Sequence, residues 1–258
     1  MVVDLDHALG VVLSALSGVL GVSPSWVFKG GTCLRKAYFG DYRFSEDLDF
    51  TVTSRLRPDE VRSLIESAAD RTAGEGVELL LAEMRIRITD DEYGRESIEV
   101  LAPYRGALRR SGDPRNIQFH LSADDELLLS AETRRLIHPY DDGSTVGGAL
   151  VCYSPAEMLA EKLRAAGGQR RYAISRDVYD ISHLVVRGAD VSRALAILPA
   201  KAAAKDVDLA VASTRFVERR EEYRADWERT LTHLVTDDTT FEAAFATTVG
   251  LLQRAETS

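Results

Sequence analysis

The stretch that decides the fold is residues 44–52, which read Phe44-Ser45-Glu46-Asp47-Leu48-Asp49-Phe50-Thr51-Val52. Apolar and polar side chains alternate along it, which is typical of a strand with one buried face. Asp47 and Asp49 therefore project from the same face, about 6–7 Å apart along the strand, and Ser45 shares that face. Two like charges repel unless a cation lies between them, and Mg²⁺ takes carboxylates together with substrate phosphates. The stretch predicts a metal platform, although an isolated Asp-x-Asp is more often an idle, solvated strand face.

Upstream, Gly30-Gly31-Thr32 lies between a short apolar strand at 26–28 and a helix predicted to run to Tyr38. Glycines let a phosphate approach the backbone, and the free amides of a helix start attract it. Alone, a Gly-Gly pair is more often a plain turn. Next to the Asp47–Asp49 strand, it predicts a phosphate cradle and a metal platform on consecutive elements.

A third carboxylate is expected on a neighbouring strand. In residues 97–101, Ile98 and Val100 share one face of a predicted strand and Glu99 points the other way. Glu99 is therefore the candidate third metal ligand. The alternative is an ordinary exposed glutamate on a strand.

Two helices later in the chain carry charged residues in unusual positions. Ser154 and Glu157 form the pattern of a capping box. Lys162 then falls within the apolar stripe of that helix, where it either snorkels to water or faces an anion such as a nucleotide phosphate. Asp177 and Asp180 share one side of the next helix. They either compensate the helix dipole, or Asp177 orients Lys162 or acts near the attacking hydroxyl.

The element pattern predicts an α/β fold with two lobes: a mixed-sheet core at 1–150 and a helical lobe at 151–258. Helices are expected at 4–20 and 58–71, and strands at 77–81, 84–89, 97–102 and 116–122. The stretches 90–94, 104–115 and 138–148 are expected to be turns or loops.

Bulk composition limits the function classes. The 258 residues are 45% hydrophobic and carry a net charge of −9, which argues against a general nucleic-acid coat protein. No run of about 18 apolar residues is evident, so we expect no membrane span. Cys33 and Cys152 match no metal-knuckle spacing and predict buried thiols in a reducing cytoplasm. A local basic rim is possible from the arginines near the motifs, which are Arg35, Arg43, Arg164, Arg170, Arg171 and Arg176.

Taken together, the blocks 28–38, 43–50, 157–165 and 176–180 resemble the AbiEii/AbiGii-type nucleotidyltransferase toxins, including the MenT toxins of mycobacteria. These belong to the DNA polymerase β-like nucleotidyltransferase superfamily. The resemblance spans about residues 26–186 and implies a nucleotidyltransferase core followed by a helical region.

The resemblance also implies roles for individual residues. Asp47 and Asp49, with Glu99, are expected to hold Mg²⁺, with Mn²⁺ as an alternative. Gly30, Gly31 and Thr32 are expected to bind the triphosphate, and Ser45 to lie beside the metal. Lys162 is expected to contact the nucleotide phosphates, helped by Arg35 or Arg43. Asp177 is expected to be an essential polar residue.

The implied activity is transfer of a nucleotide from an NTP, with a pyrimidine favoured, to the 3′ acceptor end of tRNA. This blocks aminoacylation and translation until a cognate antitoxin intervenes. Arg164, Arg170 and Arg171 are the expected contacts to the tRNA acceptor stem. Two alternatives remain: a nucleotidyltransferase that modifies a small molecule or a protein, and an inactive binding module of the same fold.

Overall fold

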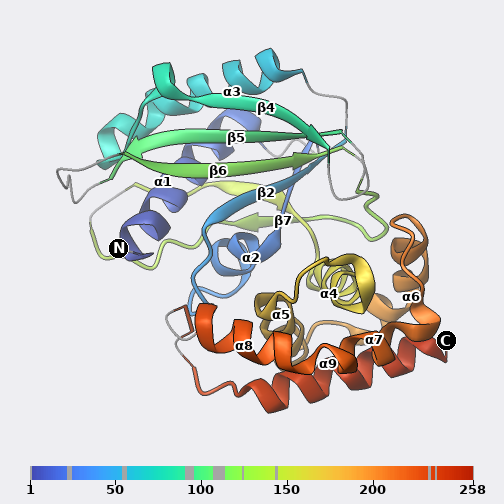
Figure 1. The fold of residues 1–258 in the computed structure, drawn as a ribbon. Helices are drawn as coiled ribbons and strands as arrows, with labels where there is room; N and C mark the ends of the chain where they lie inside the picture. Colours follow the sequence, from blue (N-terminus) through green and yellow to red (C-terminus); the bar gives the residue numbers. More distant parts are fainter. Residues whose placement is uncertain are drawn as a thin grey trace. The chain divides into compact units, whose positions relative to one another are not determined.

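The computed structural model describes residues 2–21, 25–53, 57–90, 96–106, 114–123, 125–142, 145–231, 234–235 and 237–257. The chain divides into two compact units (Figure 1). The first comprises Met1–Asp125 and Ala131–Tyr153, and the second comprises Glu126–Ser130 and Ser154–Ser258. The boundary predicted at residue 150 falls close to Ser154. The inclusion of residues 126–130 in the second unit was not predicted.

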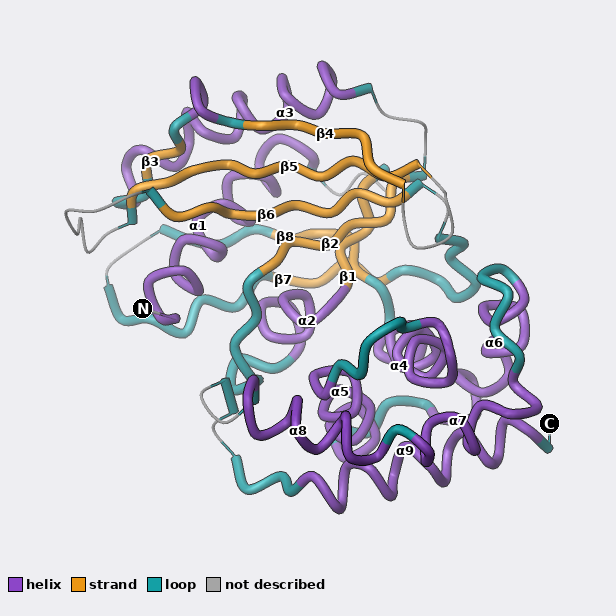
Figure 2. The backbone as a smooth tube through the Cα atoms, viewed as in Figure 1, coloured by secondary structure: helices purple, strands orange, loops and turns teal. Residues whose placement is uncertain are grey.

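The first unit is built on a mixed sheet, which has eight strands among the described residues (Figure 2). Its order is β3-β5-β6-β2-β1-β8-β7, with β4 paired to β5. The pairs β2–β6 and β1–β8 are parallel and the others are antiparallel. The strand bounds are β1 Trp26–Lys29, β2 Asp47–Val52, β3 Glu78–Leu79, β4 Arg85–Asp90, β5 Glu96–Arg105, β6 Arg115–Ser122, β7 Glu132–Arg135 and β8 Ala149–Cys152.

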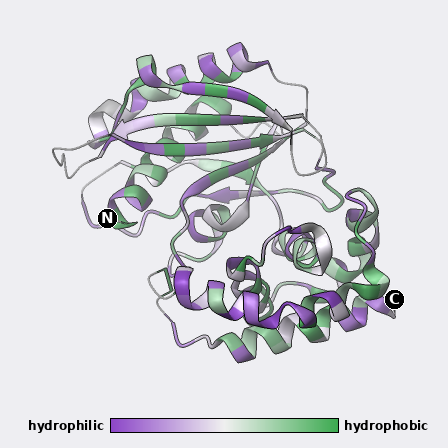
Figure 3. Ribbon diagram, viewed as in Figure 1, coloured by the Kyte–Doolittle hydropathy of each residue, from purple (hydrophilic) through white to green (hydrophobic). Residues whose placement is uncertain are grey.

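The centre of this sheet is the β1–β2 pair. Phe28 pairs with Phe50 across the two strands, and their rings stack with centroids 5.0 Å apart. Helices α1 (Val2–Leu20) and α3 (Pro58–Thr72) pack against each other and contact the sheet. Hydrophobic and hydrophilic residues alternate along β6 (Figure 3), whose burial alternates in the same way. The polar face of β2 and β6 is thereby left for the charged residues of the predicted site.

Helix α1 meets the length and hydropathy of a membrane span, with a mean hydropathy of 1.5 over its best window. Composition alone therefore does not exclude a span, contrary to our expectation. Most of that window is buried inside the protein, however, including Leu9, Leu13 and Leu16. Burial of this kind is what a core helix shows.

The second unit is helical, as the sequence predicts. Helix α9 packs against α5 and α7, and α4 packs against α5 and α6. Stacked rings of Phe216 and Phe245, 4.6 Å apart, join α7 to α9. The helix bounds are α4 Pro155–Arg164, α5 Ser175–Val186, α6 Val191–Ala203, α7 Ala212–Glu218, α8 Arg220–Thr230 and α9 Phe241–Glu256.

Several local expectations differ from the structure. Strands β7 and β8 were not predicted, and β5 extends to Arg105, into the predicted loop at 104–115. The segment predicted as a loop at 138–148 is irregular wherever it is described. Most of the predicted 90–94 turn lies outside the described residues. The helix after the Gly-Gly pair begins as α2 (Gly30–Cys33) and continues as a π-helical turn, η1 (Leu34–Tyr38).

Candidate active site

Gly30 lies directly against Asp49. The antiparallel register pairs Lys29 with Asp49, so the turn after Lys29 is placed beside that aspartate. Gly30 has a φ of +78°, which residues with a side chain rarely adopt. A Cβ atom at Gly30 would also lie 2.3 Å from Asp49 Oδ2. Both facts require glycine here, and they hold the backbone bend against the carboxylate with no side chain between them.

The same turn also contacts β2 and the residues just before it, through Gly31, Thr32 and Ser45. A Cβ atom at Gly31 would meet Ser45 Oγ at 2.9 Å and Arg43 Nη2 at 2.7 Å. The buried Thr32 hydroxyl donates a hydrogen bond to the carbonyl oxygen of Asp47 at 2.5 Å. The structure thus brings the predicted phosphate cradle and the predicted metal platform together. Because the Thr32 hydroxyl is bonded to β2, its predicted phosphate contact requires the backbone N–H.

The polar face of the sheet around the two aspartates includes residues that the sequence analysis missed. Residues paired directly across two strands share a face, so Lys29 and His120 share the face of Asp49, and Gln118 shares that of Asp47. The Lys29 ammonium donates to Asp125 Oδ2 and to Ser122 Oγ. Only the register of β1, β2 and β6 reveals this grouping, and the local pattern does not contain it.

Glu99 does not lie on the strand next to Asp47 and Asp49. That expectation is wrong because β6 lies between β2 and β5, with His120 paired to both Asp49 and Glu99. Two strand spacings, about 10 Å, separate the backbones of Asp49 and Glu99. The Glu99 carboxylate instead accepts a hydrogen bond from Gln118 Nε2 at 2.6 Å.

Arg35 is committed to a buried structural contact. Its Nε donates to Asp6 Oδ1 at 2.6 Å, its Nη1 donates to the carbonyl oxygen of Tyr42, and its guanidinium lies over the Phe44 ring. A buried arginine whose donors are engaged in this way positions η1 against α1. We therefore assign Arg35 a structural role in place of the predicted triphosphate contact.

In the second unit, Lys162 bridges two acids. Its Nζ lies 2.6 Å from Asp177 Oδ1 and 3.0 Å from Asp180 Oδ2, and Arg170 Nε lies 3.2 Å from Asp177 Oδ2. Both aspartates are buried. Burial alone raises the pKa of Asp177, but the Lys162 ammonium and the Arg170 guanidinium hold it well below its usual range. Asp177 therefore stays ionised, and the two acids together fix the position of the lysine.

The start of α4 sets the position of Lys162. The Ser154 hydroxyl accepts a hydrogen bond from the Glu157 N–H, so the predicted cap is confirmed. Glu157, however, does not complete the capping box as predicted. The Glu157 carboxylate accepts from the N–H groups of Leu128 and Leu129 and pairs with the buried Lys201. This contact explains why 126–130 belong to the second unit.

The predicted RNA-contacting arginines have different environments. Arg164 is buried, with 7% of its surface exposed, so a contact to RNA phosphates is not available to it. Arg170 is paired to Asp177, and Arg176 is half-buried at the start of α5. Arg171 is exposed and lies over the ring of Tyr172, which is also exposed.

The chemistry of the Asp47–Asp49 face fits a divalent cation. Both carboxylates are half-buried and remain accessible. Within the part of the chain that the structure describes, no hydrogen bond or ion pair reaches the Asp49 carboxylate. The neighbouring Cys33 is buried as predicted, and burial, with Cys152 close by, raises the pKa of its thiol well above the usual value. The Asp47 and Asp49 carboxylates thus offer the oxygen donors that Mg²⁺ and Mn²⁺ prefer.

Comparison with known proteins agrees with this geometry. The family model described as "Nucleotidyl transferase AbiEii toxin, Type IV TA system" matches residues 13–247. No curated protein matches the sequence significantly.

Two solved structures share the fold. JHP933 from Helicobacter pylori aligns with a TM-score of 0.59 at 16% identity, over 99% of this chain and 92% of its own. MenT4, a nucleotidyltransferase toxin from Mycobacterium tuberculosis H37Rv, aligns with a TM-score of 0.59 at 24% identity, over 98% and 81%. Since the family model covers most of the chain and the fold agrees, the protein belongs to the AbiEii family of nucleotidyltransferase toxins of toxin–antitoxin systems.

Proposed function

We propose that the protein transfers nucleotides from an NTP to the 3′ end of tRNA in the cytoplasm, in a Mg²⁺-dependent reaction, and so blocks aminoacylation. Membership of the AbiEii family establishes the coarser part: a nucleotidyltransferase toxin that uses a nucleoside triphosphate and has an antitoxin partner. The RNA acceptor and the metal are our proposal. The observation that supports the metal and triphosphate site is the contact between Gly30 and Asp49, in which a backbone bend able to receive phosphate lies against a carboxylate.

The reaction is an in-line displacement at the α-phosphorus. The 3′-hydroxyl oxygen forms the new O–P bond, the bond to the β-phosphate oxygen breaks, pyrophosphate leaves, and the hydroxyl proton passes to solvent. Asp47 and Asp49 would hold the divalent ion, which neutralises phosphate charge and polarises the reacting phosphoryl group. Gly30 and Gly31 offer backbone N–H groups to the triphosphate, and Ser45 lies beside them.

The second unit contributes a lysine of fixed orientation. Lys162, Arg170, Asp177 and Asp180 carry charges that sum to zero. Because the net charge of this group is zero, it does not attract anions over a long range. The proposed contact of Lys162 with nucleotide phosphate depends on the two acids holding its ammonium in place, which gives Asp177 its importance without requiring it to touch substrate.

The test is to sequence tRNA 3′ ends after reaction with each NTP in turn. We expect added nucleotides with the wild-type protein and none with Asp49→Asn or after removal of Mg²⁺. Asp70→Asn is the matched control, because Asp70 is an exposed aspartate on α3 of the same unit. Full activity of a folded Asp49→Asn variant would overturn the site. Transfer to a small molecule or to the protein itself, with unmodified tRNA, would overturn the acceptor while keeping the chemistry.

Arg171 is the exposed arginine through which we expect an RNA phosphate contact. Arg171→Ala should weaken tRNA binding and reduce the slope of log affinity against log salt by about 1. Arg193→Ala, which removes another exposed arginine of the same unit, is the control. Equal salt slopes for the two variants would contradict the contact.

A further inference from the structure

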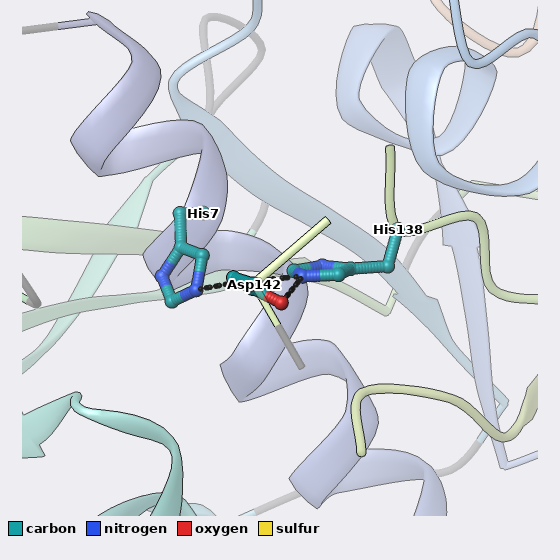
Figure 4. Close-up of side chains that lie close together, drawn as sticks. All are labelled: His7, His138 and Asp142. Carbon is teal, nitrogen blue, oxygen red and sulfur yellow. Dashed lines mark hydrogen bonds and ion pairs between the residues drawn. The ribbon is translucent and has the colours of Figure 1, made fainter. Parts of the chain in front are cut away.

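His7, His138 and Asp142 form a cluster apart from the residues of the proposed active site (Figure 4). His7 comes from α1, and the other two come from the irregular segment after β7. Each offers a ligand atom, and these three atoms lie within 4.8 Å of one another. In the described ranges, no other set of three or more histidine, cysteine or acidic side chains has this arrangement.

Both imidazoles face the same carboxylate. His7 Nε2 lies 2.8 Å from Asp142 Oδ2, and His138 Nε2 lies 3.1 Å from the same oxygen. The two rings meet edge to face, with centroids 5.4 Å apart. His138 is more than nine-tenths buried at its side chain, whereas Asp142 is about one-third exposed. The His138 ring is therefore held in place by the surrounding protein, whereas the Asp142 carboxylate is accessible to water.

The other nitrogen of each ring has no partner. His7 Nδ1 and His138 Nδ1 are buried, and neither has a hydrogen bond. Buried polar atoms are nearly always hydrogen-bonded, so two such atoms in one cluster need an explanation. Nothing at Nδ1 fixes the tautomer of either ring. The Asp142 carboxylate accepts from Nε2 of each ring, so a bound ion would take the place of the two Nε2 protons, and each neutral imidazole would then carry its proton on Nδ1.

We propose that His7, His138 and Asp142 bind a transition-metal ion of the Zn²⁺ class, with water completing the coordination. Two imidazole nitrogens and one carboxylate oxygen form a common donor set for Zn²⁺, at bond lengths of about 2.0–2.2 Å. Tetrahedral coordination at those lengths separates ligand atoms by about 3.3–3.5 Å. The observed separations of 2.8 and 3.1 Å need to widen by only a few tenths of an ångström.

The neighbouring charges favour a transition metal over Mg²⁺. Asp6, next to His7, is buried and accepts hydrogen bonds from Arg35, Lys36 and Tyr140. Asp6 is thus fully engaged and does not compete for the ion. One excess positive charge remains in that group, so affinity must come from the imidazole nitrogens rather than from long-range attraction. Imidazole donors select Zn²⁺, Cu²⁺, Ni²⁺ or Co²⁺ over the hard oxygen-seeking cations.

The same contacts indicate what the ion does. Tyr140 lies between His138 and Asp142 in sequence and donates to Asp6, so the segment already touches α1 twice. Gly10 leaves room for the His138 ring, since a Cβ atom there would lie 3.2 Å from His138 Nδ1. A bound ion would clamp the 136–142 segment to α1. The site shares no residue with the Asp47–Asp49 face, so the proposal does not depend on the proposed function.

The test uses the metal-free, full-length protein titrated with Co²⁺, whose visible absorption is intense in tetrahedral nitrogen–oxygen sites. Excess Mg²⁺ fills the Asp47–Asp49 face during the titration. We expect saturation at one equivalent, displacement by Zn²⁺, and a rise in the thermal midpoint with Zn²⁺. His7→Gln and His138→Gln should each weaken binding at least about 100-fold, since losing an outer-shell partner alone costs 10–100-fold.

Two controls separate this site from other sources of binding. His183→Gln removes another histidine near an acid, because His183 Nδ1 lies 3.5 Å from Asp237, and should leave the affinity unchanged. Asp49→Asn should also leave it unchanged, whatever that variant does to nucleotidyl transfer. Circular dichroism is used to check that each variant is folded. The proposal is overturned if the wild type shows no tetrahedral absorption, or if folded His7→Gln and His138→Gln bind Co²⁺ as the wild type does.

Discussion

Replacing Gly30 by alanine tests whether the turn and Asp49 act as one unit. The left-handed φ of +78° costs an alanine about 1–2 kcal/mol. The new Cβ atom would start 2.3 Å from Asp49 Oδ2, and contacts under 3.0 Å are not tolerated, so that oxygen must move by at least 0.7 Å. Misplacing a catalytic group by about 1 Å costs about 10²-fold in rate. Gly30→Ala should therefore lose about 1–2 kcal/mol of stability and about 100-fold in transfer rate.

The control is Gly188→Ala. Gly188 has a φ of +84° and no atom within 4 Å of its would-be Cβ, so it carries the same backbone strain without the clash. Urea unfolding should give similar losses of stability for the two variants. Single-turnover transfer of labelled nucleotide to RNA should fall only in Gly30→Ala. Equal transfer rates in the two variants would refute the idea that Gly30 holds Asp49 in place.

Three further predictions concern groups that position the site. Thr32→Val removes the hydrogen bond to the Asp47 carbonyl oxygen and should cost about 1 kcal/mol, whereas Thr32→Ser should cost less; equal costs in urea unfolding would contradict this. Glu157→Gln removes one of the two carboxylates that pair with the buried Lys201 and leaves Glu161, so it should destabilise the fold by about 2 kcal/mol; a loss under about 0.5 kcal/mol would show that the contact is dispensable. The lowered pKa of Asp177 predicts that its stabilising effect, measured against Asp177→Asn, is complete at pH 7 and declines as the pH falls below its usual value of 3.8; a difference that does not change between pH 7 and pH 2 would contradict the ion pair with Lys162.

Local patterns were enough to predict the elements that carry the site. The alternation in 44–52 gave β2 and the shared face of Asp47 and Asp49, and the Gly-Gly pair marked the turn before them. The position of Lys162 in the apolar stripe indicated either snorkelling or an anionic partner, and the reading in which Asp177 orients Lys162 agrees with the observed ion pair, which Asp180 shares. In each case the face on which the side chain lies follows from the period of its own element, so the sequence contains that information.

Features that depend on strand order or on distant partners were not predictable in this way. Glu99 has the right alternation, but β6 inserts between its strand and β2, and no local pattern encodes that order. Glu157 fits a capping box by spacing, yet its carboxylate accepts hydrogen bonds from the N–H groups of Leu128 and Leu129, which are distant in sequence. Strand β7 reads Glu-Thr-Arg-Arg and contains no apolar residue, so its sequence does not indicate a buried face.

Whether Asp47 and Asp49 hold the metal beside the triphosphate is tested by anomalous scattering from crystals soaked in Mn²⁺ and a non-hydrolysable nucleoside triphosphate. We predict a manganese peak bound by the Asp47 and Asp49 carboxylates, with the triphosphate against the backbone N–H groups of Gly30 and Gly31. A triphosphate bound elsewhere, with no manganese at these two carboxylates, would contradict it.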